Sequence, residues 1–597
     1  MVRRQCLFLV ISLGIFLALL AMTACAASNP VAEGRASSLP MPLHLSGTDP
    51  PPVPFAPSSF LINSTATPPP TPAVDPLYLT FWSYPQNPQI ETMGVSIRET
   101  LRLNETSLPG LEGEIKGFMA AAEYGGLIFA RDMATLTPTV QYLYPQEYLR
   151  LPLEEFLRRQ YTTDSQDASG NRPGAGAVSG ILAPDGHIDK ATAVSDEETS
   201  IIHAAYLYYW ITQDSDWLHK NLAGEQVIER LNSAMTWLFA RRYDERYGLI
   251  KRGHTTDWGD IKLEAAANPT DLDEGADHWT ASLYDQAVTY RALLELAEMN
   301  DAAGEWQRGG EWRQRAFALR QQANQYLWQP ERGFYRLHLH LTPLVHPFAE
   351  EEMVSIANAV AAKAGLADEQ QARSIFTVLE EVRQAAGASK AGVSLYPPYP
   401  EGTYTHPQMD VGEYQNGGLW DWWAGQQILA EFEVGFSELA LTHLTQVAAD
   451  WVRHPDKVYE WQIVESGQGW GAHHYAGAAG TMGQAIIEGM YGVSLGRGGV
   501  ILQPRLGEND GAIQVYQPAT GLYIIYSYSY DGSEAVFDYR TNYEGVLVIK
   551  LLLPQKKAVK GATMDGRSLQ CSIEIINEDS SCVLDAPGGH HRLVLAF

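Results

Sequence analysis

The sequence is poor in cysteine and in basic residues, and each shortage argues against a class of function. Only four cysteines occur among 597 residues, and they include no Cys-x-x-Cys pair. Since no zinc-type spacing of histidines is evident either, neither dithiol redox chemistry nor a metal site is expected. The 42 Lys and Arg face 70 Asp and Glu, for a formal net charge of −28. Because nucleic acids bind clustered basic side chains, we expect no nucleic-acid partner.

Long apolar runs are equally scarce. A single run, residues 7–22, approaches the length of a membrane span, but it is short for one and follows Arg3 and Arg4 as in a signal peptide. The next residues, Ala21-Met22-Thr23-Ala24-Cys25, resemble the lipobox of bacterial lipoproteins. That resemblance implies cleavage before a lipidated Cys25, with an ordinary signal peptide as the alternative.

The predicted organisation starts from this export signal. Residues 1–24 form the signal peptide, and residues 25–76 hold the lipidated cysteine and a tether rich in Pro, Ser and Thr. The mature protein is then expected to be extracytoplasmic and to touch a bacterial membrane only through its lipid. Residues 77–127 are a lead-in segment. The remaining two cysteines, Cys571 and Cys582, lie on either side of a predicted turn between two strands, which favours a hairpin disulfide.

Residues 128–495 are dominated by apolar residues at helical spacing, so the fold is predicted to be mainly α. Long loops recur at alternate junctions between the predicted helices, which indicates helical hairpins arranged around one axis. Eleven helices are readable, and the pattern leaves room for a twelfth near the start: 132–143, 146–159, 197–212, 224–242, 279–299, 311–327, 352–364, 369–386, 418–432, 436–453 and 478–491.

From residue 496 to 597 the pattern changes to strict alternation, with turn signals between the runs. This predicts a C-terminal β-sandwich that covers one end of the helical part. A separate glycan-binding role for the sandwich is the alternative.

Tryptophan is concentrated late in the helical part. Six of the 15 tryptophans, Trp420, Trp422, Trp423, Trp451, Trp461 and Trp470, fall between residues 420 and 470. Indole faces stack on sugar rings, so the cluster indicates a carbohydrate site beside long loops. Packing within a helical core is the competing explanation, above all for Trp422 or Trp423 and Trp451.

The segment Tyr414-Gln415-Asn416-Gly417-Gly418-Leu419-Trp420 precedes a predicted helix. Asn and paired Gly there allow backbone and amide groups to approach a polar ligand. A loop followed by a helix cap is the alternative explanation of the same residues. The segment resembles the Tyr-x-Asn-Gly-x-x-Trp of the (α/α)6-barrel glycosidases. That superfamily contains trehalases, processing α-glucosidases, neutral invertases, glucoamylases and debranching glucosidases.

Other segments strengthen the resemblance, which covers about residues 128–597. Phe129-Ala130-Arg131-Asp132 is similar to a segment whose charged pair, here Arg131 and Asp132, holds sugar hydroxyls in these enzymes. The glycine-rich stretch 469–492 looks like the last barrel helix and its entry. The resemblance implies an (α/α)6 barrel and inverting hydrolysis of a glycosidic bond.

For this superfamily, resemblance places the general acid in the loop at 243–278 and the base in the loop at 454–477. Asp257 in His254-Thr255-Thr256-Asp257-Trp258-Gly259-Asp260 fits the acid's pattern best, and Asp260 is the reserve. Desolvation by the adjacent Trp258 would raise the pKa of Asp257, as a general acid requires. Tyr459-Glu460-Trp461 makes Glu460 the base, with Glu465 as competitor. Asp196 is a third candidate acid, although it and Glu197 also suit a helix N-terminus.

The predicted site therefore combines two carboxylates with a sugar-binding wall. Its binding residues are Arg131, Asp132, Trp258, Tyr414, Gln415, Asn416, Gly417, Trp420, Trp461 and Trp470. The stretch 271–277 has part of a calcium-loop spacing, but lacks the distal Glu. His473 and His474 are expected to line the pocket or to be structural.

We expect a monomer that needs no cofactor and acts on an oligosaccharide or glycoside, with α-glucosides favoured. The alternatives are a glycoside phosphorylase on the same barrel and a surface lipoprotein that binds glycans without cleaving them.

Overall fold

The computed structural model describes residues 79–167, 172–190, 193–263, 277–497, 499–555 and 557–597. The signal peptide, Cys25, the tether and most of the calcium-like stretch 271–277 lie outside these ranges, so those assignments stay predictions. Within the described ranges, no helix has both the length and the hydropathy that crossing a membrane requires.

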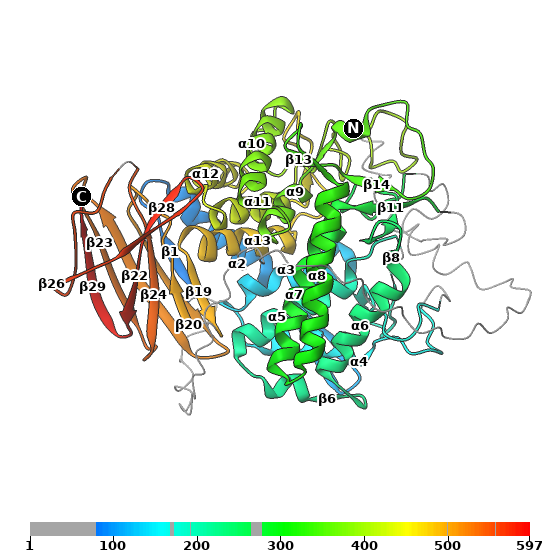
Figure 1. Cartoon of the computed structure of the whole chain (residues 1–597), viewed down its shortest axis with the longest axis horizontal. Helices are drawn as coiled ribbons and strands as arrows, with labels where there is room; N and C mark the ends of the chain where they lie inside the picture. The colour runs from blue at the N-terminus through cyan, green and yellow to red at the C-terminus, as the bar shows by residue number, and fades with distance from the viewer. Residues whose placement is uncertain (1–78, 168–171, 191–192, 264–276, 498, 556) are drawn as a thin grey trace, which may run out of the picture. The chain divides into compact units, whose positions relative to one another are not determined.

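The described residues form twelve α-helices (Figure 1). They are α2 (Pro88–Leu103), α3 (Ala130–Val140), α4 (Glu147–Arg158), α5 (Glu197–Thr212), α6 (Val227–Arg242), α7 (Leu283–Ala302), α8 (Trp306–Tyr326), α9 (Ala357–Lys363), α10 (Glu369–Ala385), α11 (Asp421–Glu433), α12 (Ser437–Arg453) and α13 (Ala476–Gln484), the last continued by a π-helical turn, η5 (Ala485–Met490). Helices α3 to α13 correspond to the eleven predicted ones, and α2 is the early helix that the pattern missed.

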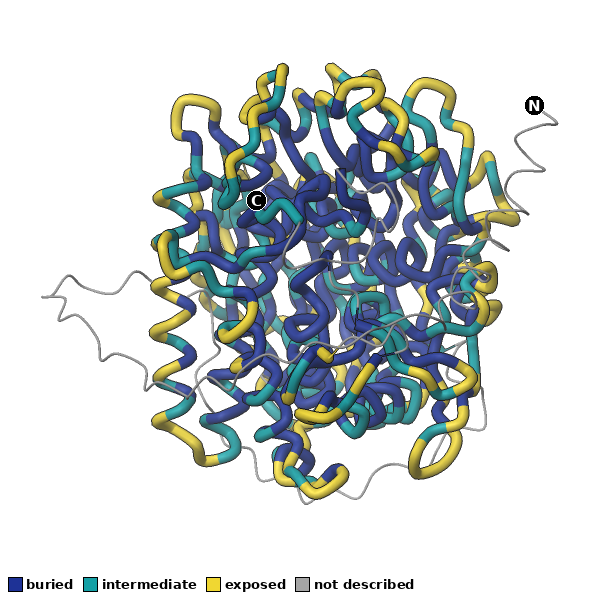
Figure 2. Tube along the Cα trace, turned by 90° about the vertical axis from the view of Figure 1, so that its right-hand side faces the viewer, coloured by how far each residue is buried: buried dark blue, intermediate teal, exposed yellow. Residues whose placement is uncertain are grey.

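Every second helix belongs to a closed ring. Helix α3 packs on α5, α5 on α7, α7 on α9, α9 on α11, α11 on α13, and α13 on α3 again. The other helices lie against the members of this ring; for example, α8 packs on α7, and α2 packs on α12 and α13. Buried segments of the chain occupy the interior and exposed ones the margin (Figure 2).

Glycines let α13 approach both of its neighbours in the ring. A Cβ at Gly480 would overlap Leu136 of α3, and one at Gly483 would overlap Thr139. On the other side, a Cβ at Gly425 of α11 would stand 2.6 Å from Thr481 Cβ and 2.7 Å from its backbone carbon. The hydroxyl of Thr139 donates to the Gly480 carbonyl at 2.5 Å across the first of these contacts. The ring can therefore close tightly only with small residues here.

The long connections all end where a ring helix begins. Segments 104–129, 159–196, 243–282, 327–356, 386–420 and 454–475 lead into α3, α5, α7, α9, α11 and α13 in turn. The reverse connections, such as 303–305 and 434–436, are shorter. Residues just before the N-termini of the ring helices are thus the ones placed to meet one another.

The C-terminal region is rich in sheet, and its strands bury alternate residues as predicted. One sheet has the order β1-β21-β22-β23-β29-β25-β26 and the other β19-β20-β24-β28-β27. The strands are β1 (Phe81–Ser83), β19 (Val493–Gly496), β20 (Gly499–Leu502), β21 (Gly511–Gln517), β22 (Leu522–Tyr530), β23 (Glu534–Thr541), β24 (Val546–Leu552), β25 (Gly561–Met564), β26 (Arg567–Leu569), β27 (Ser572–Ile576), β28 (Asp579–Pro587) and β29 (His590–Ala596). The lead-in segment contributes to both parts, because β1 pairs antiparallel with β21 while α2 packs on α12 and α13.

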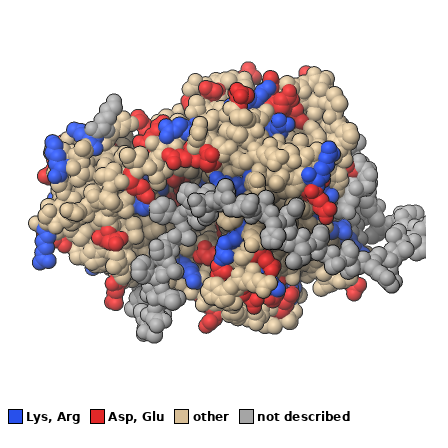
Figure 3. Space-filling view, viewed as in Figure 1, with Lys and Arg blue, Asp and Glu red and all other residues tan. Residues whose placement is uncertain are grey.

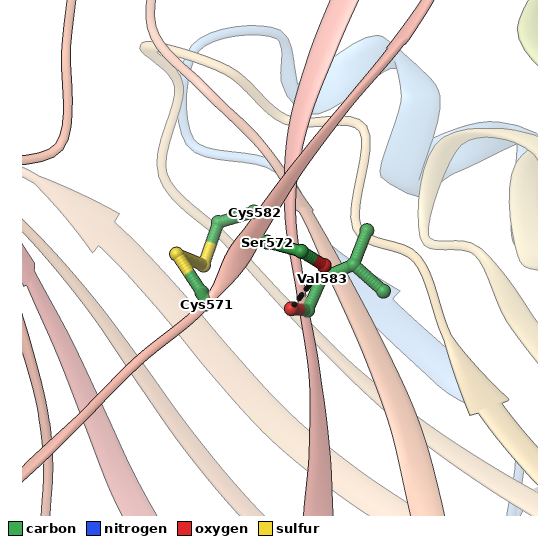
Figure 4. Close-up of a disulfide and its surroundings, with 4 residues drawn as sticks. All are labelled: Cys571, Ser572, Cys582 and Val583. Atoms are coloured by element: carbon green, nitrogen blue, oxygen red, sulfur yellow. Dashed lines mark hydrogen bonds between the residues drawn. A yellow bond between two sulfur atoms is a disulfide. The ribbon is translucent and has the colours of Figure 1, made fainter.

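The predicted disulfide between Cys571 and Cys582 is confirmed, with 5.5 Å between the two Cα atoms. Cys582 lies in β28, and Cys571 precedes the adjacent β27. The hydroxyl of Ser572 donates to the Val583 carbonyl at 3.2 Å beside the bridge (Figure 4). The bridge thus ties two neighbouring strands of the five-stranded sheet.

The glycine contacts generate a stability prediction. Gly425→Ala should lower the free energy of unfolding by about 1–3 kcal/mol, because its Cβ would press on the backbone of Thr481. Gly310→Ala, inside α8, is the matched control: its Cβ would meet nothing within 4 Å. The control should be neutral or stabilising by up to about 1 kcal/mol, since Ala is the better helix former. Urea unfolding of both variants checks this, and equal effects would contradict the packing argument.

Candidate active site

Side chains from five of the long connections meet at the N-termini of the ring helices. Tyr124 comes from the segment before α3, Arg131 and Asp132 from the first turn of α3, Asp196 from the N-terminus of α5, Asp260 from the segment before α7, Tyr414 and Gln415 from the segment before α11, and Glu460 and Tyr475 from the segment before α13. Hydrogen bonds and charges join them in one continuous group.

Glu460 is held at the centre of this group. The hydroxyl of Tyr124 donates to Oε1 at 2.8 Å, and the amide of Ala472 donates to Oε2 at 3.0 Å. Burial raises the pKa of Glu460 to about 7, and the charges of Asp132 and Asp260 act in the same direction. A carboxylate with this proton affinity can accept a proton near neutral pH, as a general base must.

Gly471 makes room for the Glu460 carboxylate. Its φ is 70°, and a Cβ there would stand 2.9 Å from Glu460 Cβ and 3.0 Å from Cδ, and closer still to Oε2. The backbone of the glycine-rich segment before α13 therefore passes beside the carboxylate at a point where no side chain fits.

Of the three candidate acids, Asp260 is the one whose charge acts on Glu460. Asp260 is half-buried, and Gln415 donates to its Oδ1 at 2.5 Å while accepting from its backbone amide at 3.2 Å. The charge of Asp260 raises the pKa of both Glu460 and Tyr414. These two couplings place the Asp260 carboxylate within electrostatic reach of the proposed base.

Asp257 has a different environment. It is fully buried, with a φ of 70°, and its Oδ1 accepts from the amide of Tyr284 at 2.9 Å. Burial raises its pKa to about 7, and the charged groups that act on it are Arg252 and Asp285 rather than Glu460. The predicted rise in pKa is present, but the side chain points into the protein interior. Its contacts are those of an anchor for the loop.

Half-buried Arg131 and buried Asp196 form an ion pair, with Nε and Nη2 of the guanidinium donating to the two carboxylate oxygens at 2.5 and 3.1 Å. Burial alone would raise the pKa of Asp196, but the charge and hydrogen bonds of Arg131, together with the charges of Arg252 and Lys190, hold the pKa below its ordinary value. An ionised carboxylate locked to a guanidinium is a poor proton donor. Asp196 is better suited to orienting Arg131.

Asp132 lies on the same side as Glu460. The Tyr475 hydroxyl donates to its Oδ1 at 3.2 Å, and burial raises the pKa of Asp132 to about 6. Arg131 and Asp132 thus present a cation and a carboxylate near Glu460, a polar pair able to bind vicinal hydroxyl groups.

The predicted aromatic residues divide into two groups. Trp258 and Trp420 are buried and pack edge to face with ring centroids 5.3 Å apart, within a cluster that also contains Trp422 and Trp423. These indoles support the loops from within. Trp422, Trp423 and Trp451 are all buried, as the core explanation requires, and Trp451 donates to Asp421 at 2.9 Å.

The second aromatic group is partly exposed. Tyr414 is half-buried, with a φ of 42° and its ring 6.1 Å from that of Trp461. Trp461 and the half-buried Trp470 are paired across β17 (Trp461–Gln462) and β18 (Gly469–Trp470), with stacked rings 6.2 Å apart. Tyr414 and Trp470 are the aromatic faces that a sugar ring could reach.

The remaining predicted residues shape loops and turns or lie away from Glu460. Asn416 is buried and exchanges hydrogen bonds with the backbone of Tyr399 at 2.7 and 3.1 Å, so it shapes the loop. Gly417 has a φ of 96°, which favours glycine. Glu465 is exposed on the turn between β17 and β18, away from the bonds that hold Glu460.

Three further predictions concern charged and imidazole side chains. Glu197 is paired with Lys190, which also holds Glu198 at 2.9 Å. His473 is exposed, and its amide donates to Glu123 at 3.3 Å. Of the calcium-like stretch, Asp277 lies in the described residues and pairs with Lys262 at 2.7 Å.

Sequence reasoning missed Tyr124, Tyr475 and a cluster of histidines. Tyr124 lies in the segment treated as a lead-in, and Tyr475 immediately precedes α13. The expectation of no metal site overlooked His254, His340, His346 and Glu350, whose donor atoms all lie within 4.8 Å of one another. His340, His346 and Glu350 lie within eleven residues of one another, so this local group of histidines could have been noticed, whereas His254 comes from a distant segment.

On the face drawn in Figure 3, the described Lys and Arg side chains are scattered among Asp and Glu rather than gathered into a basic patch.

Comparison with solved structures identifies what the fold resembles. The GH78 family rhamnosidase of Bacillus sp. GL1 aligns with a TM-score of 0.56 at 15% sequence identity, over 81% of this chain and 43% of that one. The α-L-rhamnosidase from Dictyoglumus thermophilum gives 0.58 at 12% identity, over 87% and 50% of the two chains. Streptomyces avermitilis α-L-rhamnosidase complexed with L-rhamnose gives 0.58 at 13% identity, over 87% and 42%.

The chain therefore spans half or less of the length of these rhamnosidases and shares their fold. This confirms, at the level of fold, the predicted resemblance to glycoside hydrolases. No protein-family model matches the chain, and no curated protein sequence does.

The raised pKa of Glu460 predicts a pH-dependent stability difference. Below pH 4.5 the group is protonated in both the folded and the unfolded chain, and between 4.5 and about 7 it ionises only when unfolded. Glu460 therefore lowers the free energy of unfolding of the wild-type protein as the pH rises through this window, by a total on the order of 3 kcal/mol. The melting temperature of Glu460→Gln relative to wild type should rise over that window and then level off.

Glu465→Gln is the control, because it removes an exposed carboxylate from the same segment. Its melting temperature relative to wild type should not vary over the same pH range. A flat difference for Glu460→Gln as well would show that burial does not perturb this carboxylate.

Proposed function

We propose that the protein is a glycoside hydrolase whose ring of helices is the inner wall of an (α/α)6 barrel, and that it cleaves its substrate with inversion. The observation that carries the proposal is the pair Asp260 and Glu460. These carboxylates come from different loops at one end of the ring, each is fixed by its own hydrogen bonds, and the charge of Asp260 acts on Glu460. The fold shared with rhamnosidases supports the same class of activity.

In the proposed reaction, Asp260 donates its proton to the glycosidic oxygen as the bond to the anomeric carbon breaks. Glu460 takes a proton from a water molecule, whose oxygen attacks that carbon from the opposite face. The products are the freed alcohol and a sugar of inverted configuration. After the reaction Asp260 is ionised and Glu460 is protonated, and proton exchange with solvent restores the starting state. Inversion requires room for the water, so we expect the carboxyl groups to stand roughly 6.5–9.5 Å apart.

We assign the role of general acid to Asp260, although Asp257 fits the sequence pattern better. An acid must reach the leaving oxygen, and Asp257 is fully buried with one oxygen committed to the Tyr284 amide. Gln415 holds Asp260 from the loop that also supplies Tyr414, so substrate binding and proton donation share one support.

The other polar groups bind the sugar in this proposal. Arg131, oriented by Asp196, and Asp132 bind hydroxyl groups beside Glu460. Tyr414 and Trp470 offer ring faces to the sugar C–H groups. Two substrate classes follow from the two resemblances: the sequence motifs favour α-glucosides, and the shared fold adds α-L-rhamnosides. A phosphorylase would have no use for a base held as Glu460 is.

The decisive experiment is a screen of purified protein on aryl glycosides and oligosaccharides, with and without phosphate, followed by NMR of the first-formed anomer. We expect phosphate-independent hydrolysis with inversion. On a natural-type leaving group, Asp260→Asn and Glu460→Gln should each lose roughly 10²–10⁴-fold in kcat. On a dinitrophenyl glycoside, which needs no protonation to leave, Asp260→Asn should recover much of its activity while Glu460→Gln should not.

Asp257→Asn is the matched comparison. Asn tolerates positive φ and can still accept from the Tyr284 amide, so this variant should retain most activity. If Asp257→Asn shows the leaving-group dependence and Asp260→Asn does not, the acid is Asp257. Binding of a glycan by wild-type protein without any turnover would favour a binding role and contradict hydrolysis.

Gly471 provides a separate prediction about the base. Gly471→Ala should displace the Glu460 carboxylate and reduce kcat at least roughly tenfold, as misplacement of a reacting group does. Gly467→Ala is the control, since Gly467 has a similar φ of 65° and a Cβ there would meet nothing within 4 Å. Both variants bear the same backbone strain, so equal activities would show that the close approach to Glu460 is unimportant.

A further inference from the structure

A histidine cluster, composed of His254, His338, His340, His346 and Glu350, lies at the start of the loop that carries Asp260. His254 follows β10 (Arg252–Gly253), and His338 and His340 lie in β14 (His338–His340). Strands β10 and β14 flank β11 (Trp279–Ser282) in one small sheet. His346 and Glu350 come from the chain that leads from this sheet towards α9.

The carboxylate of Glu350 is the common neighbour of the imidazoles. His254 Nε2 and His346 Nε2 stand 3.5 and 3.3 Å from Oε1, and His338 Nε2 and His340 Nε2 stand 3.1 and 2.5 Å from Oε2. His254 and Glu350 are buried, and His340 and His346 are half-buried. One nitrogen from each of His254, His340 and His346 and one oxygen of Glu350 lie within 4.8 Å of one another.

Hydrogen bonding alone does not account for this arrangement. Tyr399 also donates to Glu350 Oε1, at 2.5 Å, so five groups converge on one carboxylate. Two carboxylate oxygens offer about four lone-pair sites. A cation between the rings would accept the lone pairs of the imidazole nitrogens, so these nitrogens would not all have to donate protons to Glu350.

The spacing also suits a metal. Zinc lies about 2.0–2.1 Å from imidazole nitrogen and carboxylate oxygen, which places neighbouring tetrahedral ligands about 3.3–3.4 Å apart. The distances of 3.3 and 3.5 Å from Glu350 Oε1 to His346 and His254 match that edge length, whereas His340 Nε2 stands nearer, at the hydrogen-bond distance of 2.5 Å from Oε2.

We propose that His254, His340, His346 and Glu350 bind one divalent transition-metal ion, with Zn²⁺ as the ion they fit best. Three imidazoles and one carboxylate complete a four-coordinate site of the structural kind. Ca²⁺ and Mg²⁺ are disfavoured because they take oxygen ligands almost exclusively. His338, at 3.1 Å from Oε2, supports the carboxylate from outside the set.

The site would fasten the loop that carries Asp260 to a distant part of the chain. His254 also anchors that loop through its backbone, since its amide donates to the His278 carbonyl at 2.9 Å and its carbonyl accepts from Leu263 at 3.1 Å. A metal bond from His254 to Glu350 would hold the start of the loop from a third direction. The inference concerns metal binding and does not rest on the proposed hydrolysis.

The first test uses the wild-type full chain, stripped with a chelator and dialysed. After incubation with ZnCl₂ and desalting, elemental analysis should find about one zinc per chain, and the melting temperature should rise. CaCl₂ should give neither result. CoCl₂ should give the intense visible bands of four-coordinate Co²⁺, and ZnCl₂ should abolish them. Wild-type protein that retains no zinc and gives no Co²⁺ bands would overturn the proposal without any variant being made.

The second test compares two double variants. His340→Ala with His346→Ala should reduce zinc content to background and abolish the Co²⁺ bands and the rise in melting temperature. His590→Ala with His591→Ala removes two histidines that pair with Asp538 and Asp565 in the C-terminal sheet, and it should behave as wild type. Circular dichroism establishes that each variant is folded, and Glu350→Gln replaces the first double variant if that one is not. Undiminished zinc binding by the cluster variant would overturn the assignment.

Discussion

The closure of the helical ring depends on how near α13 can come to α3 and α11. Gly425, Gly480 and Gly483 face Thr481, Leu136 and Thr139 with no space for a Cβ. Because these contacts join α13, the last ring helix, to the first ring helix on one side and to α11 on the other, they close the ring. The ends of six helices, and the long connections that lead into them, are thereby brought to one place, so the geometry of the site depends on small residues inside the helices.

Crowding at this place then sets the proton affinities. Burial raises the pKa of Asp132 and of Glu460, the charges of Asp132 and Asp260 add to the rise at Glu460, and Arg131 is bound to Asp196. Carboxylates in such surroundings exchange protons near neutral pH instead of remaining ionised. The site is thus held by the same close packing that makes its carboxyl groups reactive.

The sequence predicted what repeats locally and missed what joins distant segments. Eleven helices could be read because their apolar faces recur every three or four residues. Helix α2 carried the same signal in Ile90, Met93, Ile97 and Leu101 after an Asn87 cap, yet it lay among strand-like residues and was overlooked. Glu460 could be found from its aromatic neighbours. The bond from Gln415 to Asp260 could not, because it joins residues 155 positions apart and depends on how two loops fold. The same holds for His254, which joins the histidine cluster from a distant segment.

The pairing of β1 with β21 affects how the chain can fold as it is made. Thr80 Oγ1 accepts a hydrogen bond from the amide of Tyr516, which lies 436 residues later. On the ribosome, the first strand emerges early and must stay without its partner until most of the protein has been synthesised. The edge of the seven-stranded sheet is consequently among the last parts that can form. Completion of this sheet requires both β1, from the early part of the described chain, and β21, from its late part.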